Sequence, residues 1–65
     1  KVKVLSIDNT TAEEYGKIKT ALMLRGRPIP DNDIWIAAIA IQYELTLISR
    51  DKHFSEVNEL EVLSW

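Results

Sequence analysis

The sequence predicts a small α/β fold with a mainly parallel sheet. Short apolar runs typical of β-strands cover residues 2–7, 45–49 and 60–63. Two segments with helical features lie between the first and the second of these runs, and one short helical turn precedes the third. Strands that alternate with helices in this way form a parallel sheet with helices packed on its faces.

The first predicted strand, residues 2–7, leads into a cluster of helix-start residues. Thr10 with Glu13, or Thr11 with Glu14, has the spacing of a capping box, in which each residue caps the backbone of the other. Asp8 is assigned to the entry of the helix.

The first helix is expected to run to about Arg25. Its apolar face is formed by side chains at helical spacing: Tyr15, Ile18, Ala21 and Leu22. Gly26 suits the left-handed position that follows a helix end, and Arg25 favours the negative end of the helix dipole.

A second helix is expected to follow the extended segment at residues 27–30, where two prolines disfavour helix. Asp31 or Asn32 is predicted to cap it, and it is expected to end near Tyr43. Apolar residues occupy every side of this helix, so it is predicted to be buried. A chain of 65 residues cannot bury it completely, which indicates partners beyond this chain.

The last part of the chain predicts two short strands around one helical turn. Residues 45–49 form a short apolar run of the kind found in buried parallel sheets. Residues 53–57 are expected to form the turn, and residues 60–63 an edge strand that leads to Trp65.

The composition is that of a globular protein, with 46% hydrophobic and 28% charged residues and no cysteine. Disulfides and thiolate metal sites are therefore excluded. Domains of this size usually need a metal or a partner, so we expect a piece of a larger domain or an obligate oligomer. No apolar run reaches the length of a membrane span and no signal-peptide pattern opens the chain, so the default expectation is a cytoplasmic protein.

The candidate chemistry rests on two carboxylates. Asp33 lies in the first turn of the second helix, and Asp51 follows the strand at residues 45–49. Ligands of open α/β sheets bind outside the carboxyl ends of the strands, where a helix start and a strand end can meet. Two carboxylates held there would suit Mg²⁺. The alternative is that Asp33 only complements the helix dipole and Asp51 only forms a turn.

Three segments follow recognisable patterns. Residues 26–38 resemble G-x-P-I-x-x-x-D-x-x-I-A-A, residues 47–54 resemble L-V-T-x-D-x-x-F, and residues 60–65 resemble the ending L-x-V-x-x-W. In these three motifs the chain resembles the PIN-domain toxins of the VapC type. The motifs occur in the family's order and spacing. The resemblance implies a three-layer α/β/α sandwich, of which residues 1–65 would be the C-terminal part.

The resemblance also implies a function. PIN domains bind Mg²⁺ or Mn²⁺ through three or four acidic residues and cleave RNA with a metal-activated water, leaving a 5′-phosphate and a 3′-hydroxyl. Asp33 matches the third acidic position, Asp51 the fourth, and Ser49 the hydroxyl that supports the site. The family's first Asp and its Glu lie upstream of this chain, so the 65 residues are expected to be inactive alone. RNA, an antitoxin protein, and a second copy or the N-terminal half are the implied partners.

Other residues have two interpretations. Lys17, Arg25 and Arg27, with Arg50 beside Asp51, could contact RNA phosphates or form a solvated surface. His53 is expected to be a surface or capping residue. Trp35 and Phe54 are expected in the core rather than stacked on nucleotides.

The alternative function is a non-catalytic module for assembly or antitoxin binding, motivated by the apolar second helix. A degenerate fragment without a function of its own is the third interpretation.

Overall fold

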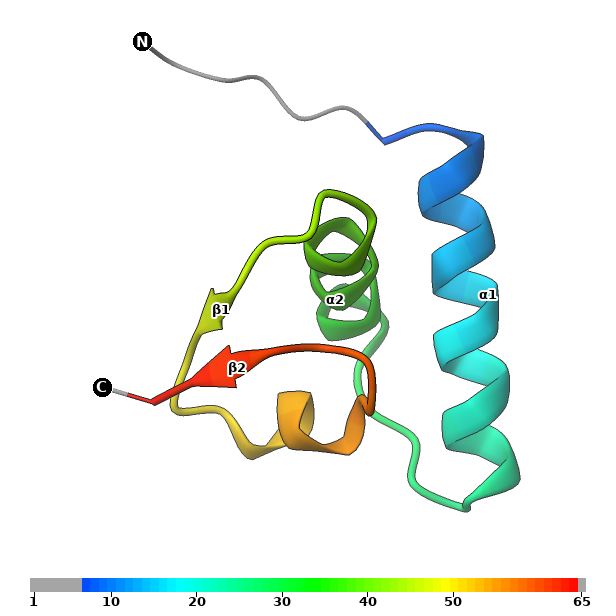
Figure 1. Ribbon diagram of the computed structural model, residues 1–65. Coiled ribbons are helices and arrows are strands. Elements are labelled where there is room, and N and C mark those ends of the chain that lie inside the picture. The colour runs from blue at the N-terminus through cyan, green and yellow to red at the C-terminus, as the bar shows by residue number, and fades with distance from the viewer. Residues whose placement is uncertain (1–6, 65) are drawn as a thin grey trace, which may run out of the picture.

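The computed structural model describes residues 7–64 (Figure 1). Its elements in chain order are α1 Asn9–Leu24, α2 Asp31–Gln42, β1 Leu47–Ile48, the 3-10 helix η1 Lys52–Glu56, and β2 Val62–Leu63. Residues 2–6 of the first predicted strand and Trp65 lie outside the described residues, and Ile7 belongs to no strand. No helix within residues 7–64 is long and apolar enough to cross a membrane.

Helix α1 begins with a capping box that differs from both predicted ones. Asp8 is the N-cap, and its carboxylate accepts hydrogen bonds from the backbone N–H groups of Thr10 and Thr11. In return, the Asp8 N–H donates to the hydroxyl of Thr11 at 3.1 Å. The boxes predicted from Thr10 with Glu13 and from Thr11 with Glu14 are therefore wrong, because Asp8 provides the cap two or three residues earlier.

Both helices end in the same hydrogen-bond pattern. After α1, the N–H groups of Gly26 and Arg27 donate to carbonyl groups of the last turn, and Gly26 has φ 67° as predicted. After α2, Glu44 and Leu45 make the equivalent bonds, but here the left-handed residue is Glu44, with φ 54°. Both ends are Schellman motifs.

Helix α2 begins without a side-chain cap. Pro30 is the N-cap residue and Asp31 is already helical, so the prediction that Asp31 or Asn32 caps the helix is wrong. The Asp31 carboxylate instead accepts a hydrogen bond from the hydroxyl of Tyr15 in α1 at 3.1 Å. Burial of α2 is partial: Ala37 and Ala38 are fully buried, whereas Ile36 is 43% exposed.

The two strands are shorter than predicted, but they pair in parallel as expected, with Leu47 opposite Val62 and Ile48 opposite Leu63. Leu47 and Val62 pack against the core. Ile48 and Leu63 are exposed. Residues 7–64 therefore cover one face of the sheet, and only part of the expected three-layer sandwich lies within them.

The core lies where α2 packs against α1 on one side and the sheet on the other (Figure 1). Leu22 and Ile18 of α1 contribute to it, whereas Ala21, predicted on the same face, is exposed. Phe54 of η1 is buried, as predicted. Its place in the core fixes η1 against α2 at the carboxyl end of β1.

Candidate metal centre

Asp33 is held by the first turn of α2, where it is the third helical residue. Its N–H donates to the carbonyl of Pro30 at 3.0 Å, and its carboxylate lies at the positive end of the helix dipole. The side chain is only 17% exposed. The negative charge of Asp33 is thus stabilised by the helix and shielded from much of the solvent.

Asp51 lies just beyond the carboxyl end of β1 and is the N-cap of η1. Its carboxylate accepts a hydrogen bond from the backbone N–H of His53 at 2.9 Å. Its own N–H donates to the Ser49 hydroxyl at 3.0 Å. Ser49 therefore supports the turn that orients Asp51, and the turn role expected under the alternative interpretation is also present.

The fold brings Asp33 and Asp51 together with His53. One ligand atom from each of the three lies within 4.8 Å of the other two. The Nδ1 atom of His53 is 2.9 Å from Oδ2 of Asp33 and 3.2 Å from Oδ1 of Asp51. The two carboxylates that the sequence singled out thus meet, and a histidine assigned to the surface or to capping joins them.

These three side chains fit a divalent cation by their chemistry. Two carboxylates held this close repel each other, and a cation removes that repulsion. Carboxylate oxygens suit Mg²⁺ and Mn²⁺, and neutral imidazole is a common metal ligand. Half of the His53 side chain is exposed, so ligands from outside residues 7–64 can reach the site.

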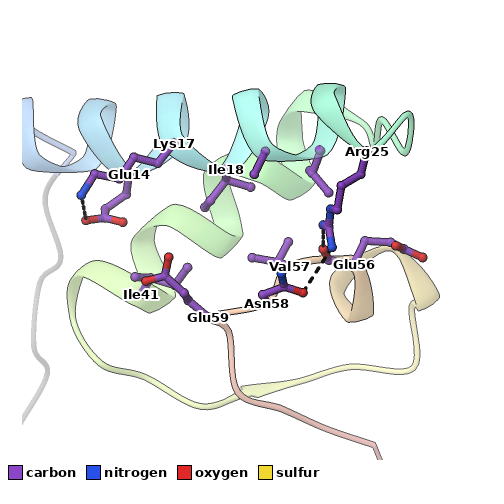
Figure 2. A pocket seen from close by; sticks show the side chains of 11 residues that line it. Glu14, Lys17, Ile18, Arg25, Ile41, Glu56, Val57, Asn58 and Glu59 are labelled. Carbon is purple, nitrogen blue, oxygen red and sulfur yellow. Dashed lines mark hydrogen bonds and ion pairs between the residues drawn. The ribbon is translucent and has the colours of Figure 1, made fainter.

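The predicted phosphate-contacting residues of α1 and the following loop lie elsewhere. Lys17 pairs with Glu14 at 3.7 Å, and Arg27 pairs with Glu56 at 3.5 Å. Arg25 donates to the carbonyl of Glu56 and to the side chain of Asn58. Figure 2 shows Lys17 and Arg25 lining a cavity whose other residues include Glu14, Glu56 and Glu59 but neither Asp33 nor Asp51. Intramolecular partners thus engage these three cations.

Arg50 stands apart from them in location, since it is exposed on the turn between Ser49 and Asp51. This places it next to the carboxylates in sequence. It remains the predicted phosphate contact that adjoins the candidate centre.

His53 is the site residue that the sequence analysis missed. Its signal was its position two residues after Asp51, at the start of a helical turn. The side chain of a residue at this position can point back toward the end of the strand. The spacing alone does not show whether the His53 ring takes that orientation. Trp35, expected in the core, is partly buried and stacks on Tyr15 with ring centroids 4.2 Å apart.

The sequence model of the PIN domain matches residues 1–60. Among curated proteins, Ribonuclease VapC1 of Haemophilus influenzae is 35% identical over 66 residues, which take in 100% of this chain and 49% of that protein. Ribonuclease VapC4 of Mycobacterium tuberculosis is 27% identical over 60 residues, covering 92% of this chain and 46% of its own length. The chain spans about half the length of the curated relatives it matches.

Solved structures agree with these matches. VapBC-1 from nontypeable Haemophilus influenzae superposes on 98% of the chain with a TM-score of 0.87 and 35% identity, which takes in 48% of its own chain. VapBC2 from Rickettsia felis, solved bound to a promoter DNA fragment, covers 89% of this chain and 44% of its own at a TM-score of 0.82 and 29% identity.

Proposed function

The chain belongs to the PIN domain family, and from this premise we propose that the protein containing it is a metal-dependent endoribonuclease. The convergence of Asp33 and Asp51 at the carboxyl end of a parallel strand carries the proposal. We further propose that residues 1–65 are the C-terminal part of the domain and that the remaining acidic ligands come from the rest of the protein.

The residues of this chain have separate tasks in the proposed site. Asp33 and Asp51 hold Mg²⁺ or Mn²⁺, which supplies Lewis-acid activation of water and of the phosphate when bound. Ser49 orients Asp51 through the turn, and the first turn of α2 stabilises the charge of Asp33. Arg50 contacts a phosphate of the RNA, a role that its exposed position between Ser49 and Asp51 supports.

Two observations support binding partners for this chain. The relatives in the solved structures are VapBC complexes, and one of them is described as a member of a family of toxin–antitoxin systems. The exposed Ile48 and Leu63 on the open face of the sheet offer an apolar surface. We propose that the rest of the domain covers this face and that the whole protein binds a cognate antitoxin. A purely assembling module is the alternative, and it requires no metal.

The test uses the whole protein, with RNA cleavage and calorimetric Mn²⁺ binding measured on the same samples. Asp33→Asn and Asp51→Asn are each expected to weaken Mn²⁺ binding by roughly 10–100-fold or more. Loss of a residue that only supports a metal ligand already has an effect of this size, and these two residues are proposed as ligands themselves. Cleavage should fall in both variants. Asp31→Asn is the matched control. It removes a carboxylate from the same helix turn, but this carboxylate accepts a hydrogen bond from Tyr15 and is not part of the proposed site. Unchanged binding and cleavage in both Asp33→Asn and Asp51→Asn would contradict the proposal.

A further inference from the structure

His53 directs a single ring nitrogen at both carboxylates of the candidate centre. Nδ1 is 2.9 Å from Asp33 and 3.2 Å from Asp51, and the chain contains no other histidine. The neighbours of His53 hold its backbone in place. The backbone N–H of His53 is bonded to Asp51, and the adjacent Phe54 is buried in the core. The fold thus fixes the backbone of His53 on both sides.

The spacing of these atoms is that of neighbouring ligands on one ion. Carboxylate oxygens and imidazole nitrogens bind small divalent ions at about 2.1 Å, so adjacent ligands of an octahedral ion lie roughly 3 Å apart. Both distances from Nδ1 are close to this value. With the carboxylate oxygens also within 4.8 Å of each other, the three ligand atoms have separations compatible with one shared ion.

We infer that His53 is a nitrogen ligand of the ion held by Asp33 and Asp51, and that it makes the site favour transition-metal ions over Mg²⁺. This inference rests on the proposed function, which needs only the two carboxylates. Mg²⁺ is a hard cation that takes oxygen ligands and keeps its waters, so it gains little from imidazole. Affinity of a site with nitrogen donors rises from Mn²⁺ to Co²⁺ and Ni²⁺.

A structural role for His53 has a different consequence. If the ring served only to bridge the two carboxylates by hydrogen bonds, it would compete with the ion for their oxygens. Removing it would then strengthen the binding of every divalent cation. A ligand role predicts the opposite sign, and an effect that depends on the ion.

The experiment uses the whole protein loaded with Mn²⁺. Pulsed EPR measures whether the electron spin of Mn²⁺ is coupled to the nucleus of a bound nitrogen atom. A directly bound nitrogen is expected in the wild type and absent in His53→Ala. Calorimetry at one pH above neutrality should show that His53→Ala weakens Co²⁺ binding by roughly tenfold or more, Mn²⁺ less, and Mg²⁺ least. Lys52→Ala is the matched control, because it alters the adjacent exposed residue of η1 and leaves all three candidate metal ligands in place.

The wild-type spectrum keeps the test decisive even if the variant folds poorly. Bound Mn²⁺ that depends on Asp33 and Asp51 but shows no nitrogen coupling overturns the inference and leaves the proposed function standing. Equal loss for Mg²⁺ and Co²⁺, or tighter binding after His53→Ala, also overturns it. If neither aspartate affects Mn²⁺ binding, the proposed function itself fails.

Discussion

The helical layer and the two-stranded sheet differ in how far residues 7–64 cover them. Between α1 and α2 the packing is closed: Leu22 is 1% exposed and Ala37 is fully buried. On the sheet, the paired residues Ile48 and Leu63 are 61% and 55% exposed. Within residues 7–64, the contact between the two helices is covered, whereas the outer face of the sheet is not.

The candidate metal centre lies where these two regions meet. Asp33 belongs to the closed region and is 17% exposed, whereas Asp51 follows the strand and is 44% exposed. The carboxylate of Asp33 is held in position by the packing of α2 within residues 7–64. The strand-end side of the centre is open in residues 7–64, which is where ligands from the rest of the domain would enter.

The largest expected change in the stability of the whole protein comes from truncating apolar side chains in these two regions. Leu22→Ala is expected to lower the free energy of unfolding by about 2–5 kcal/mol, because it leaves a cavity between α1 and α2. Ile48→Ala should lower it by at least about 1 kcal/mol, since we propose that the remaining part of the domain covers Ile48. Urea denaturation measures both, with Thr20→Ala on the exposed side of α1 as control.

An effect of Ile48→Ala within about 0.5 kcal/mol, the range of ordinary surface substitutions, would mean that the sheet face stays open in the whole protein. The assembling role would then gain support, because an exposed apolar face calls for a partner.

The features that could be predicted from the sequence differ from those that could not. From the first helix onward, the order of elements, the parallel pairing and the Gly26 helix end were predicted correctly from composition and spacing. The predicted capping boxes of α1 and the predicted cap of α2 were wrong, although Asp8 does stand at the helix entry to which it was assigned. At α1, Asp8 forms a capping box with Thr11 instead, and at α2 the Asp31 carboxylate turns to Tyr15 rather than to the backbone of its own helix.

The candidate centre was predictable in part for a related reason. Asp33 and Asp51 were found from their places at a helix start and a strand end, and the structure brings them together. Their role as ligands stays a prediction. His53 could not be assigned from sequence, because its contact with Asp33 spans 20 positions and depends on how Phe54 seats η1 against α2.

A smaller effect is expected at the two helix ends, one of which leads to α2 and the other toward the sheet. Gly26→Ala should lower the free energy of unfolding by about 1–2 kcal/mol, since φ is 67° and no neighbouring atom stands within 4 Å to add a clash. Glu44→Gly should raise it by up to about 1 kcal/mol, because relief of the left-handed conformation exceeds the entropy that glycine adds to the unfolded chain.

Thermal and urea unfolding of both variants provide the measurement. Opposite signs are the expected outcome, since the two positions share one backbone conformation and differ in side chain. If Glu44→Gly instead destabilises the protein, the Glu44 side chain must contribute contacts in the whole domain that outweigh its strained backbone.

The smallest effect concerns Asp8, which links the two helices at the far end from their loop. Besides capping α1, its carboxylate accepts a hydrogen bond from Gln42 at the end of α2 at 2.9 Å. Gln42 also contacts the fully buried Thr11. The backbone N–H of Thr11, followed by the side chain of Gln42, lowers the pKa of Asp8 below its ordinary value of 3.8.

A lowered folded-state pKa means that the charge of Asp8 stabilises the protein above pH 3.8 and that this contribution disappears as the pH falls through the folded value. Asp8→Asn keeps a cap oxygen but has no charge to lose. The wild type should therefore unfold at higher urea concentration than Asp8→Asn near neutral pH, and the two midpoints should converge in acid. A gap that stays constant over this pH range would show that Asp8 stabilises the junction of α1 and α2 through hydrogen-bond geometry alone, because only a charge-dependent contribution can titrate away.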